Sequence, residues 1–138
     1  MVKEFMIIGA FSGIAWAVDP NWTEQEWNKF EKAIHHVETS GKGIGTVGDS
    51  GEAYGPLQIH KGAFLDSGVA GEWESCLNDL ELSRKVLRGY IKRYLPKNGT
   101  MERAACIWNA GPVKGEFKKS KKWKATEEYR RKFRKVAG

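Results

Sequence analysis

The sequence has few of the features that let a chain fold without a hydrophobic core or span a membrane. Its 138 residues include two cysteines, too few for a disulfide-dense mini-protein or a four-cysteine zinc site. No apolar run approaches the roughly 20 residues that a membrane-spanning helix needs. There are no internal repeats and no low-complexity linker. These absences exclude disulfide scaffolds, repeat proteins and multi-span membrane proteins.

What the chain does contain is enough apolar material for one ordinary globular domain. Aromatic residues make up 12% of the sequence, with six tryptophans, and 41% of the residues are hydrophobic. Such a composition excludes an intrinsically disordered chain, which would be poor in aromatics. A chain of this length is expected to form a single domain and to bury about two-thirds of its unfolded surface.

The N-terminal residues are typical of an export signal. Lys3 precedes an apolar stretch, residues 5–16, and the stretch ends in the A-x-A-like sequence Ala15-Trp16-Ala17. We therefore expect residues 1–17 to be a signal peptide and residues 18–138 to be one mature domain, secreted or periplasmic. A buried N-terminal helix and an uncleaved anchor are the alternatives.

The state of the two cysteines depends on export. In an oxidising compartment Cys76 and Cys106 could form one disulfide, the alternative being two buried thiols.

The net charge of +6 is concentrated at the C-terminal end, since residues 114–138 hold eleven basic and three acidic residues. The segment 118–124 (KKSKKWK) favours the anionic polymers of a cell envelope as a partner. A merely solvated surface is the alternative, and we expect no nucleic-acid partner.

Capping residues and apolar spacing predict an α+β domain that is mostly helical. Thr23-Glu24-Gln25-Glu26 forms a capping-box pattern before a helix over residues 24–38. One face of this helix carries Trp27, Phe30, Ile34 and Val37. Residues 41–55 contain six glycines, which predicts loops or a small β-hairpin. Further helices are expected over 56–65, 78–94, 101–109 and from Thr126, as its cap, to the C-terminus.

Two carboxyl groups are candidates for catalysis because their expected surroundings differ. Glu38 follows apolar Val37 at the C-terminal end of the first helix, where apolar neighbours and the helix dipole disfavour ionisation. Asp49 lies between two glycines in a polar turn, where a carboxyl stays ionised. Glycosidic-bond cleavage uses one carboxyl of each kind. Glu52 is the alternative to Asp49, and on spacing alone such a pair is more often structural than catalytic.

Three motifs, in this order along the chain, resemble those of the lysozyme-like superfamily. Residues 37–41 (VETSG) resemble its catalytic "ES-G" motif. Residues 48–59 (GDSGEAYGPLQI) resemble the glycine-bounded segment of goose-type lysozymes and lytic transglycosylases, and end in a sequence similar to the "GP-QI" of invertebrate-type lysozymes. Residues 107–112 (IWNAGP) are similar to the "YNAG" motif of lytic transglycosylases. Thr39 and Trp108 depart from the family pattern, as does the low cysteine content.

The resemblance implies a lysozyme-like fold and peptidoglycan strands as the substrate. Glu38 would be the general acid that protonates the oxygen of the β-1,4 bond between N-acetylmuramic acid and N-acetylglucosamine, and Asp49 the second carboxylate. The implied substrate-binding residues are Ser40, Tyr54, Gly55, Gln58, Trp108 and Asn109. Gly55 would let the backbone approach the substrate closely. No metal or other cofactor is implied, and we expect a monomer.

Three functions remain open at this point. Attack by water would make the protein a muramidase, a lysozyme-like glycoside hydrolase in which Asp49 assists. Attack by the muramic acid 6-hydroxyl would make it a lytic transglycosylase that forms 1,6-anhydro products and does not need Asp49. A cell-envelope adaptor that binds glycan without cutting it is the non-enzymatic alternative.

Overall fold

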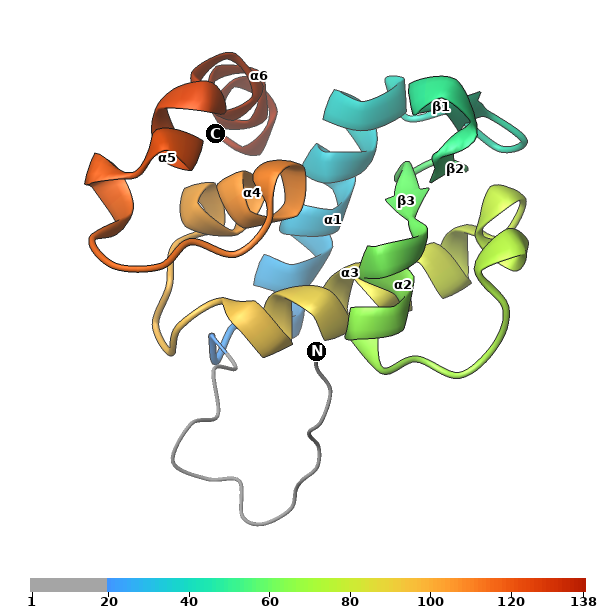
Figure 1. Ribbon diagram of the computed structural model, residues 1–138, viewed down its shortest axis with the longest axis horizontal. Coiled ribbons are helices and arrows are strands. Elements are labelled where there is room, and N and C mark those ends of the chain that lie inside the picture. Colours follow the sequence, from blue (N-terminus) through green and yellow to red (C-terminus); the bar gives the residue numbers. More distant parts are fainter. Residues whose placement is uncertain (1–19) are drawn as a thin grey trace, which may run out of the picture.

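The chain folds into helices with a very small sheet at one side (Figure 1). The structure is a computed structural model that describes residues 20–138; the expected signal peptide, residues 1–17, lies outside them. The helices are α1 (Glu24–Thr39), α2 (Lys61–Ser67), α3 (Leu80–Tyr94), α4 (Met101–Ala110), α5 (Lys121–Ala125) and α6 (Glu127–Ala137). The antiparallel sheet has the order β1 (Val47–Gly48), β2 (Ala53–Tyr54), β3 (Ile59–His60). Short 3₁₀ helices are η2 (Asp49–Gly51), η3 (Trp73–Leu77) and η4 (Phe117–Lys119).

The predicted mostly helical α+β class is confirmed, and the predicted helix starts are largely correct. At α1 the capping box is present, with the Glu26 N–H donating to Thr23 Oγ1 at 3.1 Å and the Thr23 N–H donating to Glu26 Oε1 at 2.8 Å. Thr100 caps α4 by accepting from the N–H of Arg103. No helix in residues 20–138 combines the length and apolarity needed to cross a bilayer.

The helix predicted over residues 56–65 is wrong in its first half. Residues 56–58 form a turn, β3 follows, and α2 begins only at Lys61. The reason is tertiary, because β3 pairs with β2 in the register Tyr54↔Ile59 and the turn between them needs a left-handed Gln58 with φ of 53°. Thr126 occupies the predicted N-cap position of α6, but its side chain makes no capping hydrogen bond, because its hydroxyl donates to the carbonyls of Lys122 and Trp123.

α1 lies in the middle of the fold and buries one face against the other elements. α6 packs on α1 and α4, and α2 packs on α3. Figure 1 shows the sheet and α2 on one side of α1 and the helices α4, α5 and α6 on the other. The fully buried apolar side chains include Phe30, Ile34, Leu57, Ile59, Val86, Leu87, Ile91 and Ile107. Truncating a buried aromatic such as Phe30 to Ala would cost about 3–5 kcal/mol. The C-terminal end of α1 thus lies where the two sides meet.

The two cysteines do not form a disulfide in this structure and are present as two buried thiols. Cys76 lies in η3 and Cys106 in α4, and both are buried. The Cys106 thiol donates to the carbonyl oxygen of Lys122 at 3.7 Å. Burial raises the pKa of both thiols.

Candidate active site

A cavity of about 500 Å³ lies where α1, the sheet and the helices α2, α3 and α4 meet. Its volume is within the range of sites that bind small molecules or one segment of a polymer. The residues that line it are Glu38, Asp49, Gln58, His60, Ala63, Tyr90, Trp108 and Asn109. It therefore collects side chains from all three motifs of the sequence.

Glu38 is the buried carboxyl of this cavity. It lies in the last turn of α1, and the phenol of Tyr129 on α6 donates to its Oε2 at 2.7 Å. Burial raises the pKa of Glu38 to about 7, opposed by the Tyr129 hydrogen bond and reinforced by the charge of Asp49. A carboxyl with this pKa is still substantially protonated near neutral pH, as a general acid must be.

Asp49 lies on the sheet side of the cavity and is held by a histidine. It follows β1 in η2, where Asp49 and Ser50 both have positive φ, 48° and 56°. His60, the last residue of β3, places its Nε2 2.9 Å from Asp49 Oδ2. Both side chains are exposed, with 68% of the Asp49 side-chain surface and 52% of the His60 side-chain surface accessible to solvent. The antiparallel pairing of β1, β2 and β3 brings these two residues together although eleven positions separate them.

The amides and the indole of the cavity are held by local contacts. Gln58 Nε2 donates to the carbonyl of Gly55 at 2.9 Å. Gly48 makes room for it, because a Cβ at that position would lie 2.1 Å from Gln58 Oε1. Trp108 packs edge-on against Tyr90, with ring centroids 5.5 Å apart. Amides and aromatic faces are the groups with which proteins hold sugar rings.

Three of the predicted substrate-binding residues do not line the cavity. Ser40 is exposed in the left-handed position that ends α1. Tyr54 stacks face to face on Trp73, with centroids 4.1 Å apart. Gly55, with φ of 78°, would place a Cβ 2.0 Å from the carbonyl oxygen of Cys76. The close backbone approach that was expected at Gly55 is therefore to η3 and not to a ligand. The sequence could not show this because η3 lies about twenty residues further along the chain.

Comparison with known proteins gives partial sequence matches and one extended structural match. No protein-family model matches the chain. It is 31% identical to Lysozyme 1 of Crassostrea virginica over 86 residues, covering 59% of this chain and 47% of that protein. It is 34% identical to a lysozyme of Ostrea edulis over 62 residues, covering 42% of this chain and 45% of that protein. The chain thus spans about half the length of the curated relatives it matches.

The structural match extends over nearly the whole chain. It is to a chain in the crystal structure of Aeromonas hydrophila PliI in complex with Meretrix lusoria lysozyme, with a TM-score of 0.64, 22% identity and coverage of 91% of this chain and 96% of that one. At 22% identity this match shows that the chain has a lysozyme-like fold. The lysozyme-like fold expected from the three motifs is therefore confirmed.

Two residues of the candidate site were missed at the level of sequence. His60 follows Gln58 by two positions, but only the strand pairing shows that it reaches Asp49. Tyr129 lies within the last predicted helix, and only the packing of α6 on α1 places its hydroxyl on Glu38. Glu52, the alternative second carboxyl, is exposed and does not line the cavity.

In the part of the chain that the structure describes, the histidines near the candidate site are not placed together as metal ligands. No group of three or more His, Cys, Asp or Glu side chains is placed there to hold an ion. His35 Nε2 instead lies 2.7 Å from the carbonyl oxygen of Lys42, in the loop after α1. The described site therefore offers carboxyl, amide, imidazole and aromatic groups for its chemistry.

Replacing Tyr129 with Phe should move the pH at which Glu38 ionises in the candidate site. The Tyr129 hydrogen bond lowers the pKa of Glu38, so its removal should raise that pKa, by about one unit for a hydrogen bond to a charged group. The alkaline half-maximum of the activity should move to higher pH by the same amount. A pH profile of cleavage by Tyr129→Phe measures this, and an unmoved profile would show that the contact does not tune the acid.

Proposed function

We propose that this lysozyme-like domain is a muramidase, a glycoside hydrolase that cuts the β-1,4 bond between N-acetylmuramic acid and N-acetylglucosamine in peptidoglycan. The observation that carries the proposal is the pair of carboxyl groups in one cavity. Burial raises the pKa of Glu38 to about 7, and the carboxyl of Asp49 is exposed and paired with His60. The bivalve relatives named lysozyme support the same activity.

In the proposed reaction each lining residue has a chemical task. Glu38 donates its proton to the glycosidic oxygen, so that the leaving sugar departs as a neutral alcohol. Asp49 assists the water that attacks, or stabilises the positive charge that develops on the sugar ring. Gln58 and Asn109 hydrogen-bond the sugar or its N-acetyl group, and Trp108 supplies an apolar face.

A lytic transglycosylase is the second candidate within the same cavity. There the muramic acid 6-hydroxyl replaces water as the nucleophile, so that no second carboxylate is required. The contact between Asp49 and His60 favours hydrolysis, because it holds a second carboxyl at the cavity that transglycosylation would not use. A glycan-binding adaptor is the weaker alternative, because binding alone does not need a carboxyl whose ionisation is suppressed by burial.

The proposed setting is outside the cytoplasm, secreted or periplasmic, with the peptidoglycan glycan strands as the partner. The C-terminal residues 114–138 carry eleven basic against three acidic residues. Their positive field would attract the anionic polymers of a cell envelope and raise the rate of encounter at low salt.

Mass spectrometry of digested peptidoglycan tests the proposal. We expect the wild type to release fragments with reducing ends, and Asp49→Asn to be slower by about 10²-fold, the lower range for losing a general base. Glu52→Gln is the matched control, since Glu52 is another exposed carboxyl three residues away that lines no cavity, and it should retain activity. Anhydro ends from an equally active Asp49→Asn would identify a transglycosylase, and binding without any cleavage would identify an adaptor.

A further inference from the structure

A second cavity, of about 330 Å³, lies beside the loop that follows α4. Its lining residues are Pro112, Val113, Lys114, Ser120, Lys121 and Lys122. Three of these six are lysines and none is acidic, so the cavity has an uncompensated positive charge. Pro112, Val113 and the lysine stems give it apolar walls. A ligand that suits it has carboxylates together with small apolar groups.

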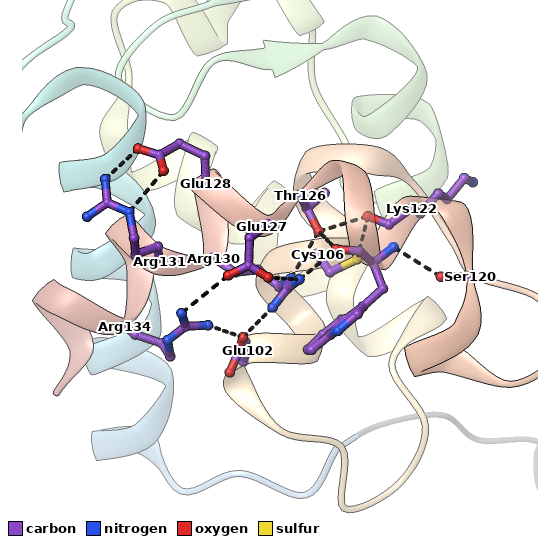
Figure 2. A network of polar contacts seen from close by, with 11 residues as sticks. Glu102, Cys106, Ser120, Lys122, Thr126, Glu127, Glu128, Arg130, Arg131 and Arg134 are labelled. Atoms are coloured by element: carbon purple, nitrogen blue, oxygen red, sulfur yellow. Dashed lines mark hydrogen bonds and ion pairs between the residues drawn. The ribbon is translucent and has the colours of Figure 1, made fainter.

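Internal contacts hold this cavity open. The Lys122 ammonium donates to the carbonyl oxygen of Pro112 at 2.7 Å and so ties the loop to α5. The carbonyl oxygen of Lys122 in turn accepts from Thr126, and the Ser120 hydroxyl accepts from the N–H of Trp123 (Figure 2). The side chains of Lys114 and Lys121 are exposed and form no ion pair with any of residues 20–138. The ammonium groups of Lys114 and Lys121 are therefore available to a ligand, on backbone that these hydrogen bonds hold in place.

The second cavity is close to the catalytic one along the chain. Asn109 lines the catalytic cavity and Pro112 lines the second, and they are three residues apart. Three residues of chain span at most about 11 Å. A peptide of three or four residues, attached to a sugar bound at Asn109, is long enough to reach the second cavity.

We propose that this cavity binds the short acidic peptide that muramic acid residues carry on the lactyl group. The inference rests on the proposed function, because the glycan strand brings the peptide to the site. Carboxylates of the peptide pair with Lys114 and Lys121, and its small apolar side chains contact Pro112 and Val113. Those apolar walls favour a peptide over a phosphate polymer, which has only polar groups to offer.

Binding of two disaccharides tests the inference. The probes are N-acetylglucosaminyl-N-acetylmuramic acid with and without its tetrapeptide. A muramidase cuts at C1 of N-acetylmuramic acid, whereas the bond in these probes is at C1 of N-acetylglucosamine, so they stay intact. Isothermal titration with the wild type should show about 5–10-fold tighter binding of the peptide-bearing disaccharide, as two exposed charge pairs supply. Lys114→Glu/Lys121→Glu should reduce this ratio to about one and leave the affinity for the peptide-free disaccharide unchanged.

The matched control is Lys132→Glu/Lys135→Glu, which makes the same change of charge on exposed residues of α6. It should keep the preference for the peptide. Equal loss in both double variants would show diffuse attraction and overturn the inference, as would equal binding of the two disaccharides or binding of neither. A polyglycerol phosphate that binds in a Lys114- and Lys121-dependent way, with no peptide preference, would identify a phosphate polymer as the occupant and overturn it too. Cleavage of peptidoglycan by the same preparation decides separately about the proposed function.

Discussion

Glu38→Gln is expected to abolish most cleavage of peptidoglycan, lowering the rate by at least about 10³-fold, within the range measured for a general acid. The amide has nearly the same shape and can still accept the hydrogen bond from Tyr129, but it has no proton to transfer at any accessible pH. Turbidity loss of purified cell walls and release of soluble fragments measure the effect. Equal activity of the two proteins would remove Glu38 from the mechanism.

The pH profile of the wild type belongs to the same prediction. Because only protonated Glu38 can donate, activity should fall as the pH rises through its pKa of about 7. The lytic rate of the wild type should therefore have an alkaline half-maximum near that pH. A rate that keeps rising well above that pH would contradict the role given to Glu38.

The same substitution should stabilise the folded protein at neutral and alkaline pH. The pKa of Glu38 is about 7 in the folded state against a model value of 4.5, so the folded state binds the proton more tightly than the unfolded one. Stability linked to this group is complete below about pH 4.5 and is lost as the pH rises through 7. Glutamine does not ionise, so Glu38→Gln should gain about 1–3 kcal/mol over the wild type at pH 8 and nothing at pH 4. Thermal melts at the two pH values check this and show that the inactive variant is folded.

Arg130→Met is expected to lower the free energy of unfolding by about 3–5 kcal/mol, a large part of the 5–15 kcal/mol that holds a domain together. The Arg130 side chain is 2% exposed. Its guanidinium donates to Glu102 at 2.7 Å, to the carbonyl oxygen of Trp123 at 2.6 Å and to Thr126 at 3.1 Å (Figure 2). It also stacks 3.5 Å from the centre of the Trp123 ring.

Methionine fills much of the volume but leaves these acceptors without their buried donor. The melting temperature should fall by on the order of 10 °C for a domain of this size. Activity should fall with it near the transition, because Arg130 anchors the helix that carries Tyr129 to Glu38.

Arg131→Met is the matched control for Arg130→Met. Arg131 is the next residue on the same helix, is 50% exposed and, among residues 20–138, pairs with Glu128 one turn away (Figure 2). Its replacement should leave the melting temperature within about 2 °C, since exposed pairs contribute little. Similar losses for the two variants would mean that removing positive charge from α6, and not the buried network, accounts for the effect.

Local signals predicted most of the helices, and both carboxyl groups proposed for catalysis line one cavity. The capping box at Thr23 and the apolar face of α1 act within a few residues, so the bounds of this helix follow from the sequence. The same holds for Glu38, whose place beside apolar Val37 at the end of α1 already favoured a raised pKa. Five of the predicted site residues line one cavity: Glu38, Asp49, Gln58, Trp108 and Asn109.

These predictions failed because each position makes a contact with another segment of the chain that its local pattern does not contain. Pro56 was expected to begin a helix, but the pairing of β3 with β2 places it in a turn. Gly55 was expected to face a ligand, but it packs against the carbonyl of Cys76. Tyr54 was expected to face the sugar, but Trp73 covers its ring.

The sequence by itself determined the helical domain, the position of a carboxyl at the end of its first helix and the concentration of positive charge after residue 113. Tertiary structure decided the rest, because pairing partners and burial depend on segments that no local pattern links. The packing of α6 on α1 gives Glu38 its hydrogen bond from Tyr129, and the sheet gives Asp49 its contact with His60. Burial in that assembled site is what raises the pKa of Glu38 to about 7.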